Sequence, residues 1–330
     1  MKKMTRKVEI SHKTILFTIF VLLALVFLSK IADIILQFFI ALLVTAFLNP
    51  YVTKLSKYKI PRGVSVLLFY VIILAIFSFS VSAVVPPLVE QSSSFVNNIP
   101  GFMQNVGISS IVSDRIVEQL LTQLGSVPGE IAKATALIFS NVLTLVAVFV
   151  LSFYLLTERE KLDSQISHMF GESKKDKVTS VVNHLEVKLG GWVRGQITLM
   201  LVVGTATYIG LTILGIPFAL PLAIISGLFE VIPYVGPFLS AIPGVVIGFG
   251  LSPLMGFAAA ACYFLVQQLE NYLFVPKIMQ HSAGVHPIIT LLALAIGFRL
   301  DGIVGLLISV PIFITVRVLL TELIFKKHLA

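Results

Sequence analysis

Residues 211–250 read LTILGIPFALPLAIISGLFEVIPYVGPFLSAIPGVVIGFG and contain one charged side chain, Glu230. Apolar runs of this length are typical of membrane segments, because a helix needs about 20 apolar residues to cross a bilayer. Pro233 and Pro237 interrupt the run, and proline breaks a helix by removing a backbone donor and clashing with the preceding turn. The stretch therefore predicts a helical hairpin with a break close to Glu230.

The whole chain has the composition of a membrane protein. It has 330 residues, of which 57% are hydrophobic and 12% charged, and its mean hydropathy is +1.00. Soluble domains contain about 45–50% apolar and about 25% charged residues. Soluble enzymes, DNA-binding modules and disulfide scaffolds are therefore excluded, and the single cysteine, Cys262, has no internal partner. We expect an all-α, polytopic integral membrane helical bundle with the bilayer as its first partner and no role for nucleic acid.

The apolar runs divide one transmembrane domain, residues 1–330, into five parts. We expect amino-terminal spans in 14–89, with a helix pair in 14–48, an extracytoplasmic amphipathic segment in 90–133, a span in 134–156, a cytoplasmic amphipathic segment in 157–194, and carboxyl-terminal spans with two hairpin-like repeats in 195–325. The basic residues of 157–194 are typical of a helix that lies in the headgroup layer of an anionic leaflet. The alternative is that both amphipathic segments simply pack on the bundle.

The distribution of Lys and Arg predicts the orientation. Basic residues dominate the amino end, the 49–62 loop and the carboxyl end, whereas the 86–133 segment has more acids than bases. Positive loops remain on the cytoplasmic side. We therefore expect a multi-pass protein of the cell (cytoplasmic) membrane with both termini in the cytoplasm.

The second half contains two similar patterns of proline, glycine and charge. Pro217 is followed by Gly227 and then Glu230, and Pro287 is followed by Gly297 and then a charged pair. We interpret these as two related hairpins, either full spans or re-entrant, although chance similarity is the alternative. A break at membrane depth must be buried in protein or line a wet cavity, because freed backbone groups cost several kcal/mol each in lipid. A plain surface loop is the competing interpretation.

Ionisable side chains inside the membrane are costly and are functional candidates by default. Glu230 adjoins the break, and Glu270 shares a helix face with Gln267, while Gln267 shares one with Asn271. We expect substrate or ion binding at Glu230, Pro233, Tyr234, Gly236, Pro237, Gln267, Gln268, Glu270 and Asn271, and coupling or gating at Arg194, Gln196, Arg299 and Asp301. The alternative is a structural ion pair between one of the two glutamates and Arg194 or Arg299. We expect no metal and no cofactor.

The chain resembles the autoinducer-2 exporter family of permeases over nearly its whole length. The motifs that carry the resemblance are EVIPYVGP at 230–237, IPR at 60–62, RGQ at 194–196, QLE at 268–270, HP at 286–287 and GIVG at 302–305. The tip at Arg299 and Asp301 is more charged than the family pattern. The resemblance implies about eight spans and export of small solutes; some members are linked to autoinducer-2 export and others to sodium/proton antiport.

Three functions follow from these observations. The first is an ion-coupled secondary transporter that exports a small polar solute, such as an autoinducer-2-like signalling molecule or related metabolite. The second is a monovalent cation (sodium or lithium)/proton antiporter that uses the Glu230 and Glu270 carboxylates. The third is a structural or assembly protein of the membrane. A membrane enzyme or an ATP-driven pump is disfavoured because the sequence lacks their motifs. We also expect a homo-oligomer.

Overall fold

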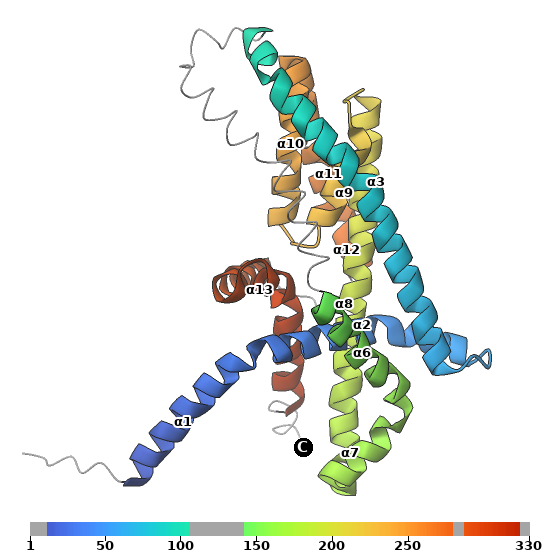
Figure 1. The fold of residues 1–330 in the computed structure, drawn as a ribbon, viewed down its shortest axis with the longest axis vertical. Helices are drawn as coiled ribbons and strands as arrows, with labels where there is room; N and C mark the ends of the chain where they lie inside the picture. Colours follow the sequence, from blue (N-terminus) through green and yellow to red (C-terminus); the bar gives the residue numbers. More distant parts are fainter. Residues whose placement is uncertain (1–11, 106–141, 280–286, 324–330) are drawn as a thin grey trace, which may run out of the picture.

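The computed structural model describes residues 12–105, 142–279 and 287–323, and these are built from helices without any strand (Figure 1). The all-α prediction is confirmed. Four of the described helices are long and apolar enough to cross a membrane, and four shorter apolar helices accompany them. This is consistent with a polytopic helical membrane protein.

The first described part of the chain, residues 12–105, consists of three helices, α1 (His12–Lys30), α2 (Ala32–Ser56) and α3 (Arg62–Asn105). The expected helix pair in 14–48 is present, with the bend at Ile31 between α1 and α2. Figure 1 shows α1 standing clear of the other helices, and most of its described side chains are exposed. Most of the expected amphipathic segment in 90–133 lies outside the described residues.

The middle of the chain leads into the longest uninterrupted helix of the second half. Its elements are α6 (Val142–Thr157), the short turn η2 (Arg159–Lys161), α7 (Leu162–Phe170) and α8 (Glu172–Ile213). Helix α8 has 42 residues and is therefore about 63 Å long. It continues through residue 194 without a break, so the basic amphipathic segment and the following apolar span are one rod.

Helix α8 crosses α2 with almost no space between the two backbones. A Cβ atom on Gly190 would lie 2.2 Å from the Ala46 carbonyl oxygen. The crossing is surrounded by a core cluster that α2, α8 and α13 share, with Ala46, Leu189 and Ile314 among its buried members. The glycine is needed here because any side chain would push the helices apart.

A polar cluster attaches the loops of the amino-terminal half to α8. Arg62 donates hydrogen bonds to the Leu156 carbonyl at 3.1 Å and to Asn49 at 2.7 Å. Asn49 in turn donates to Glu186, which also forms an ion pair of 2.7 Å with Arg159. The arginine of the 60–62 motif therefore has a structural role, joining α2, α3 and α6.

The first hairpin consists of α9 (Ala219–Phe229) and α10 (Val235–Leu251), and residues 230–234 form its tip. With 11 residues, α9 is about 16 Å long, shorter than the roughly 30 Å of hydrocarbon in a bilayer. The chain then continues through α11 (Pro253–Leu269), the π-helical turn η3 (Glu270–Phe274) and α12 (Val275–Ile278).

The second hairpin lies within α13 (Pro287–Leu323). Asp301 and Gly302 have non-helical backbone angles, so the chain reverses direction between two helical arms. The arms approach closely, because a Cβ on Gly297 would lie 2.3 Å from the Gly305 carbonyl oxygen. Gly227 in the first hairpin instead faces α8, where its Cβ would meet the Met200 carbonyl at 2.7 Å. The two hairpins share a pattern, but their glycines contact different partners.

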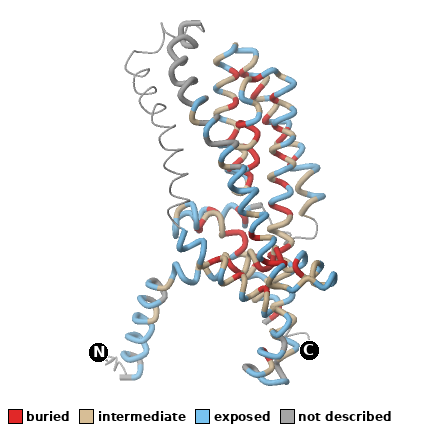
Figure 2. Tube along the Cα trace, turned by 45° about the vertical axis from the view of Figure 1, so that its right-hand side comes forward, coloured by how far each residue is buried: buried red, intermediate tan, exposed pale blue. Residues whose placement is uncertain are grey.

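Burial in the described residues follows the inner faces of the helices, and the outer faces are exposed and apolar (Figure 2). Leu143 and Ile213, for example, are 86% and 79% exposed. Exposed apolar surface on this scale is unfavourable in water and favourable in lipid.

Candidate functional site

A cavity of about 480 Å³ lies where α8, the first hairpin, α11 and η3 meet. Its lining includes Tyr234 and Pro237 from the hairpin, and Gln267, Glu270 and Asn271 from α11 and η3. The structure therefore brings together residues that the sequence places more than 30 positions apart. The volume falls within the range of small-molecule sites.

The hairpin tip beside the cavity is held in place by contacts to its own backbone and by its backbone conformation. The Gln196 side-chain amide donates a hydrogen bond of 2.6 Å to the Glu230 carbonyl oxygen. Tyr234 has a φ of 66°, a left-handed conformation that is uncommon for a residue with a side chain. A Cβ on Gly236 would lie 1.8 Å from the Phe229 carbonyl oxygen, so only glycine fits there.

Glu230 and Glu270 form the acidic centre of the site. Their side chains are buried, with residue exposures of 2% and 5%, and their carboxyl groups lie within hydrogen-bonding reach of one another. The Oε2 atom of each has no hydrogen-bond partner in the described part of the chain. Two like charges this close repel strongly when buried, which favours a shared proton or a bound cation between them.

The local backbone explains how Glu270 reaches this position. It begins the five-residue π-helical turn η3, where the helix widens by one residue. π-Helical turns inside α-helices occur frequently at functional sites. Gln267, three residues earlier, lies within hydrogen-bonding reach of the Glu270 carboxyl.

Hydroxyl groups form a second polar surface of the cavity that the sequence analysis missed. Thr207, Ser226, Ser240 and Tyr263 all line it, the Thr207 and Tyr263 hydroxyls are buried, and that of Thr207 has no hydrogen-bond partner among the described residues. Tyr263 lies on the face of α11 that leads through Gln267 to Glu270, at spacings of four and three. The same helix face, followed one turn from Gln267 towards the amino end of α11, predicts Tyr263 as a further polar residue of the site.

The remaining predicted residues lie beside the cavity or elsewhere. Pro233 is part of the hairpin tip, and Gln268 is not among the residues that line the cavity. Arg194 donates to the Ala46 carbonyl at 3.3 Å, at the crossing of α2 and α8. Arg299 and Asp301 lie at the tip of the second hairpin, where Asp301 and Asp33 line a separate cavity of about 550 Å³.

The chemistry of the cavity fits a small cation, a proton or a hydroxyl-rich solute. In the part of the chain that the structure describes, neither glutamate forms an ion pair with Arg194 or Arg299. The described residues also contain no group of three or more His, Cys, Asp or Glu side chains arranged to hold a metal ion. Oxygen ligands of this kind are suited to hard cations and to hydroxyl groups.

Comparison with known proteins identifies the family of the chain. Residues 15–325 match the family described as AI-2E family transporter. "Putative transport protein YueF" of Bacillus subtilis is 31% identical over 290 residues, which cover 82% of this chain and 78% of the relative. "Putative transport protein YrrI" of the same organism is 26% identical, covering 86% and 85%, and "Putative transport protein YhhT" of Escherichia coli is 24% identical, covering 85% and 82%. The chain, with its apolar helices and its cavity at a broken hairpin, belongs to the AI-2E family of membrane transport proteins.

Proposed function

We propose that this protein is an ion-coupled secondary transporter that exports a small polar solute of the autoinducer-2-like class or a related metabolite. The observation that carries the proposal is the pair of buried carboxyl groups, Glu230 and Glu270, at a broken helix beside a 480 Å³ cavity. Discontinuous helices with ionisable groups are how many secondary transporters form their substrate and ion sites.

The two polar surfaces of the cavity suit different parts of this task. The carboxyl pair takes the coupling cation or proton, because Glu270 is the only charged side chain among the described residues that line the cavity, and the Glu230 carboxyl lies within hydrogen-bonding reach of it. The hydroxyl of Thr207 has no partner among the described residues and so is available to a hydroxyl group of a solute, and the Tyr263 hydroxyl lines the same cavity. A solute bound there would satisfy polar atoms that are otherwise buried at a cost.

A second candidate function is monovalent cation/proton antiport. The observation that favours it is the proximity of the Glu230 and Glu270 carboxyls, which allows a sodium or lithium ion to replace a shared proton. In this case the same pair is the transported-ion site and the cavity is its access route.

Proton and cation exchange in liposomes tests the ion-binding role. Purified protein is reconstituted with a pH-sensitive dye inside, sodium, lithium or potassium is added outside, and internal pH is followed. We expect a cation-dependent pH change that is lost in Glu230→Gln and Glu270→Gln. Glu172→Gln is the matched control, because Glu172 is an exposed carboxylate paired with Lys175 at 3.7 Å, away from the cavity lining.

Solute flux separates the two candidate functions. Export of a labelled polyol driven by a proton or sodium gradient, with loss in the same variants, supports the solute transporter. A pH response without any solute flux supports the antiporter. Normal activity of both kinds in folded Glu230→Gln and Glu270→Gln protein would refute the site.

We further propose a location in the cell membrane, with both termini in the cytoplasm, and a homo-oligomeric assembly. The basic loop at 49–62 supports the orientation. The apolar helix α1, which stands clear of the other described helices, supports contacts with a second copy. A cysteine placed at the exposed Lys57 in a Cys262→Ala background should react with impermeant maleimide only after the cytoplasmic side is opened. Photobleaching of single labelled particles counts the subunits, and one step per particle would contradict the oligomer.

A further inference from the structure

Four aromatic side chains line the 480 Å³ cavity at the first hairpin (the hairpin cavity). Tyr234 and Phe238 come from the hairpin, and Tyr263 and Phe264 come from α11. Tyr263 is buried and lies at the inner wall, whereas Phe238 and Phe264 are exposed and lie at the open side. Aromatic rings therefore border the hairpin cavity from its interior to its opening.

The charge that borders these rings is negative. Glu270 lines the hairpin cavity, and its Oε2 atom has no hydrogen-bond partner among the described residues. When Glu270 and Glu230 share one proton, the pair keeps one negative charge. No Lys, Arg or His is among the described residues that line the cavity. A buried charge without a partner is costly, so a monovalent cation that neutralises it is bound favourably.

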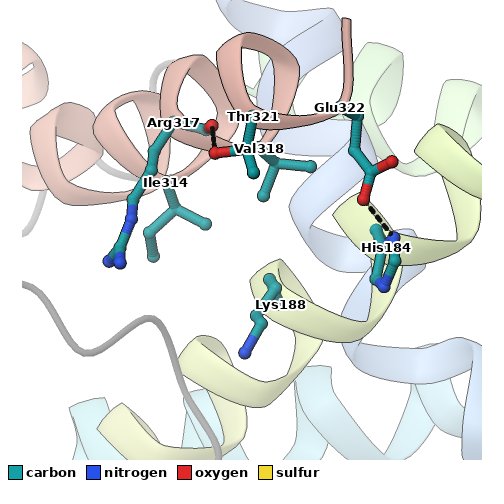
Figure 3. Close-up of a pocket in the computed structure, with 7 residues that line it drawn as sticks. All are labelled: His184, Lys188, Ile314, Arg317, Val318, Thr321 and Glu322. Carbon is teal, nitrogen blue, oxygen red and sulfur yellow. Dashed lines mark hydrogen bonds and ion pairs between the residues drawn. The ribbon is translucent and has the colours of Figure 1, made fainter. Parts of the chain in front are cut away.

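A second charged cavity, of about 230 Å³ between α8 and α13, differs in this respect (Figure 3). His184 Nδ1 and Glu322 Oε1 are 2.9 Å apart there, so the carboxylate is engaged by a side chain of the protein. Lys188 and Arg317 also line this cavity, so its charges are mixed. Of the two cavities, the hairpin cavity is therefore the one whose lining is acidic without a basic residue among the described ones.

We propose that the hairpin cavity binds organic cations, with a protonated amine as the charged group on a small apolar body. That the bound amine is also exported rests on the proposed transport function. The ammonium group pairs with the Glu270 carboxyl, and Tyr234 lies within electrostatic reach of that carboxyl. Because the face of an aromatic ring attracts cations, the Tyr234 ring strengthens binding of the same ammonium group.

The apolar body distinguishes this ligand from sodium or lithium. Phe238 and Phe264 at the open side of the cavity provide apolar surface that the body of an organic cation can cover. An inorganic ion has no apolar surface to bury against these rings, and it loses its hydration on entering. The walls therefore favour an organic cation over an inorganic ion of the same charge, and the carboxyl pair disfavours an anion.

The test measures binding to the full-length protein in neutral detergent by isothermal titration calorimetry. The probes are phenethylamine, which is protonated at neutral pH, its neutral isostere phenethyl alcohol, and the anion phenylpropanoate. Removing one partner of a buried charge pair weakens binding by a factor of about 30 or more. We therefore expect the alcohol to bind at least about 30-fold more weakly than the amine, and the anion more weakly still.

Substitutions separate the carboxyl group from the rings. Glu270→Gln should weaken amine binding at least about 30-fold and leave alcohol binding unchanged. Tyr234→Leu and Phe264→Leu should each weaken amine binding about fivefold, and Tyr234→Phe, which keeps the ring, should retain most of it. Phe257→Leu is the matched control, because Phe257 is also an exposed phenylalanine of α11 but does not line the cavity.

Loss of amine binding in Glu270→Gln and in the two leucine variants of the lining, with retention in Tyr234→Phe and Phe257→Leu, supports the site. The proposal is overturned if phenethyl alcohol or phenylpropanoate binds as tightly as the amine. It is also overturned if Glu270→Gln binds the amine as tightly as Phe257→Leu, or if Tyr234→Leu and Phe264→Leu both do.

Flux in liposomes distinguishes a failure of this inference from a failure of the proposed transport function. The flux probe is benzyltrimethylammonium, which is permanently charged and cannot cross the bilayer as a free base. If no amine binds but polyol export still depends on Glu270, the substrate class is refuted and the transport function stands. If the amine binds as expected but neither benzyltrimethylammonium nor a polyol is exported, the binding site stands and the transport function is refuted.

Discussion

Replacing Gly236 by alanine should displace the tip of the first hairpin. The added Cβ would lie 1.8 Å from the Phe229 carbonyl oxygen and 2.5 Å from its carbon, and both are backbone atoms that cannot rotate away. An ordinary contact of about 3.2 Å requires a movement of roughly 1.4 Å next to Glu230. Overpacking of this kind costs about 1–3 kcal/mol, and the higher helix propensity of alanine returns up to about 1 kcal/mol. We expect a net destabilisation of about 1–2 kcal/mol.

The same substitution at Gly63 is the matched control. A Cβ there would lie 3.6 Å from the Phe153 ring, which is an ordinary contact, so we expect no loss of stability. The free energy of unfolding is measured by titrating sodium dodecyl sulfate into mixed micelles, and transport is measured in liposomes. Gly236→Ala should lose both stability and transport, and Gly63→Ala neither. If Gly236→Ala is as stable and as active as Gly63→Ala, the close packing at the tip has no role in holding Glu230.

Three further substitutions test single contacts by the same unfolding titration. Gln196→Leu removes the 2.6 Å hydrogen bond to the Glu230 carbonyl and leaves a buried acceptor unsatisfied, which should cost about 1–3 kcal/mol; an unchanged free energy of unfolding would show that the bond is not formed. Tyr70→Phe removes the hydroxyl that contacts Ser152 Oγ at 2.6 Å and the Phe149 carbonyl oxygen at 3.0 Å, at an expected cost of about 1 kcal/mol, and a stabilised variant would contradict this. Thr207→Val replaces a hydroxyl that has no partner among the residues that the structure describes, so stability should stay equal or rise by about 1 kcal/mol while solute affinity measured by equilibrium binding falls; unchanged affinity would place the solute elsewhere.

The sequence was sufficient to predict the helical membrane architecture and the first hairpin. Long uncharged runs have few alternatives to membrane helices, and Pro233 and Pro237 interrupt the run where the tip is observed. The candidate pair Glu230 and Glu270 was also identified, because charge is rare in such runs. Because the two residues are 40 positions apart, their distance in space cannot be inferred from the sequence, and the hairpin fold is what brings them together.

Other features depend on contacts between segments that are distant in sequence. Hydropathy does not predict that α8 is continuous through residue 194. The sequence changes from polar to apolar at that point, but the backbone stays helical. The π-helical turn at Glu270 has no propensity signal in a single sequence. The hydroxyls of Thr207 and Tyr263 resemble ordinary helix residues until α8 and α11 are placed around one cavity.

The uninterrupted helix α8 can tilt as a rigid body about a single point. Its backbone packs directly against α2 at Gly190, which can serve as the pivot, with Ile213 about 35 Å away and Gln196 about 9 Å away. A rotation of about 5° at that point would move the far end by about 3 Å but the Gln196 amide by less than about 1 Å. The hydrogen bond at Glu230 would therefore survive a tilt that displaces the distant end of α8 by almost the width of a water molecule.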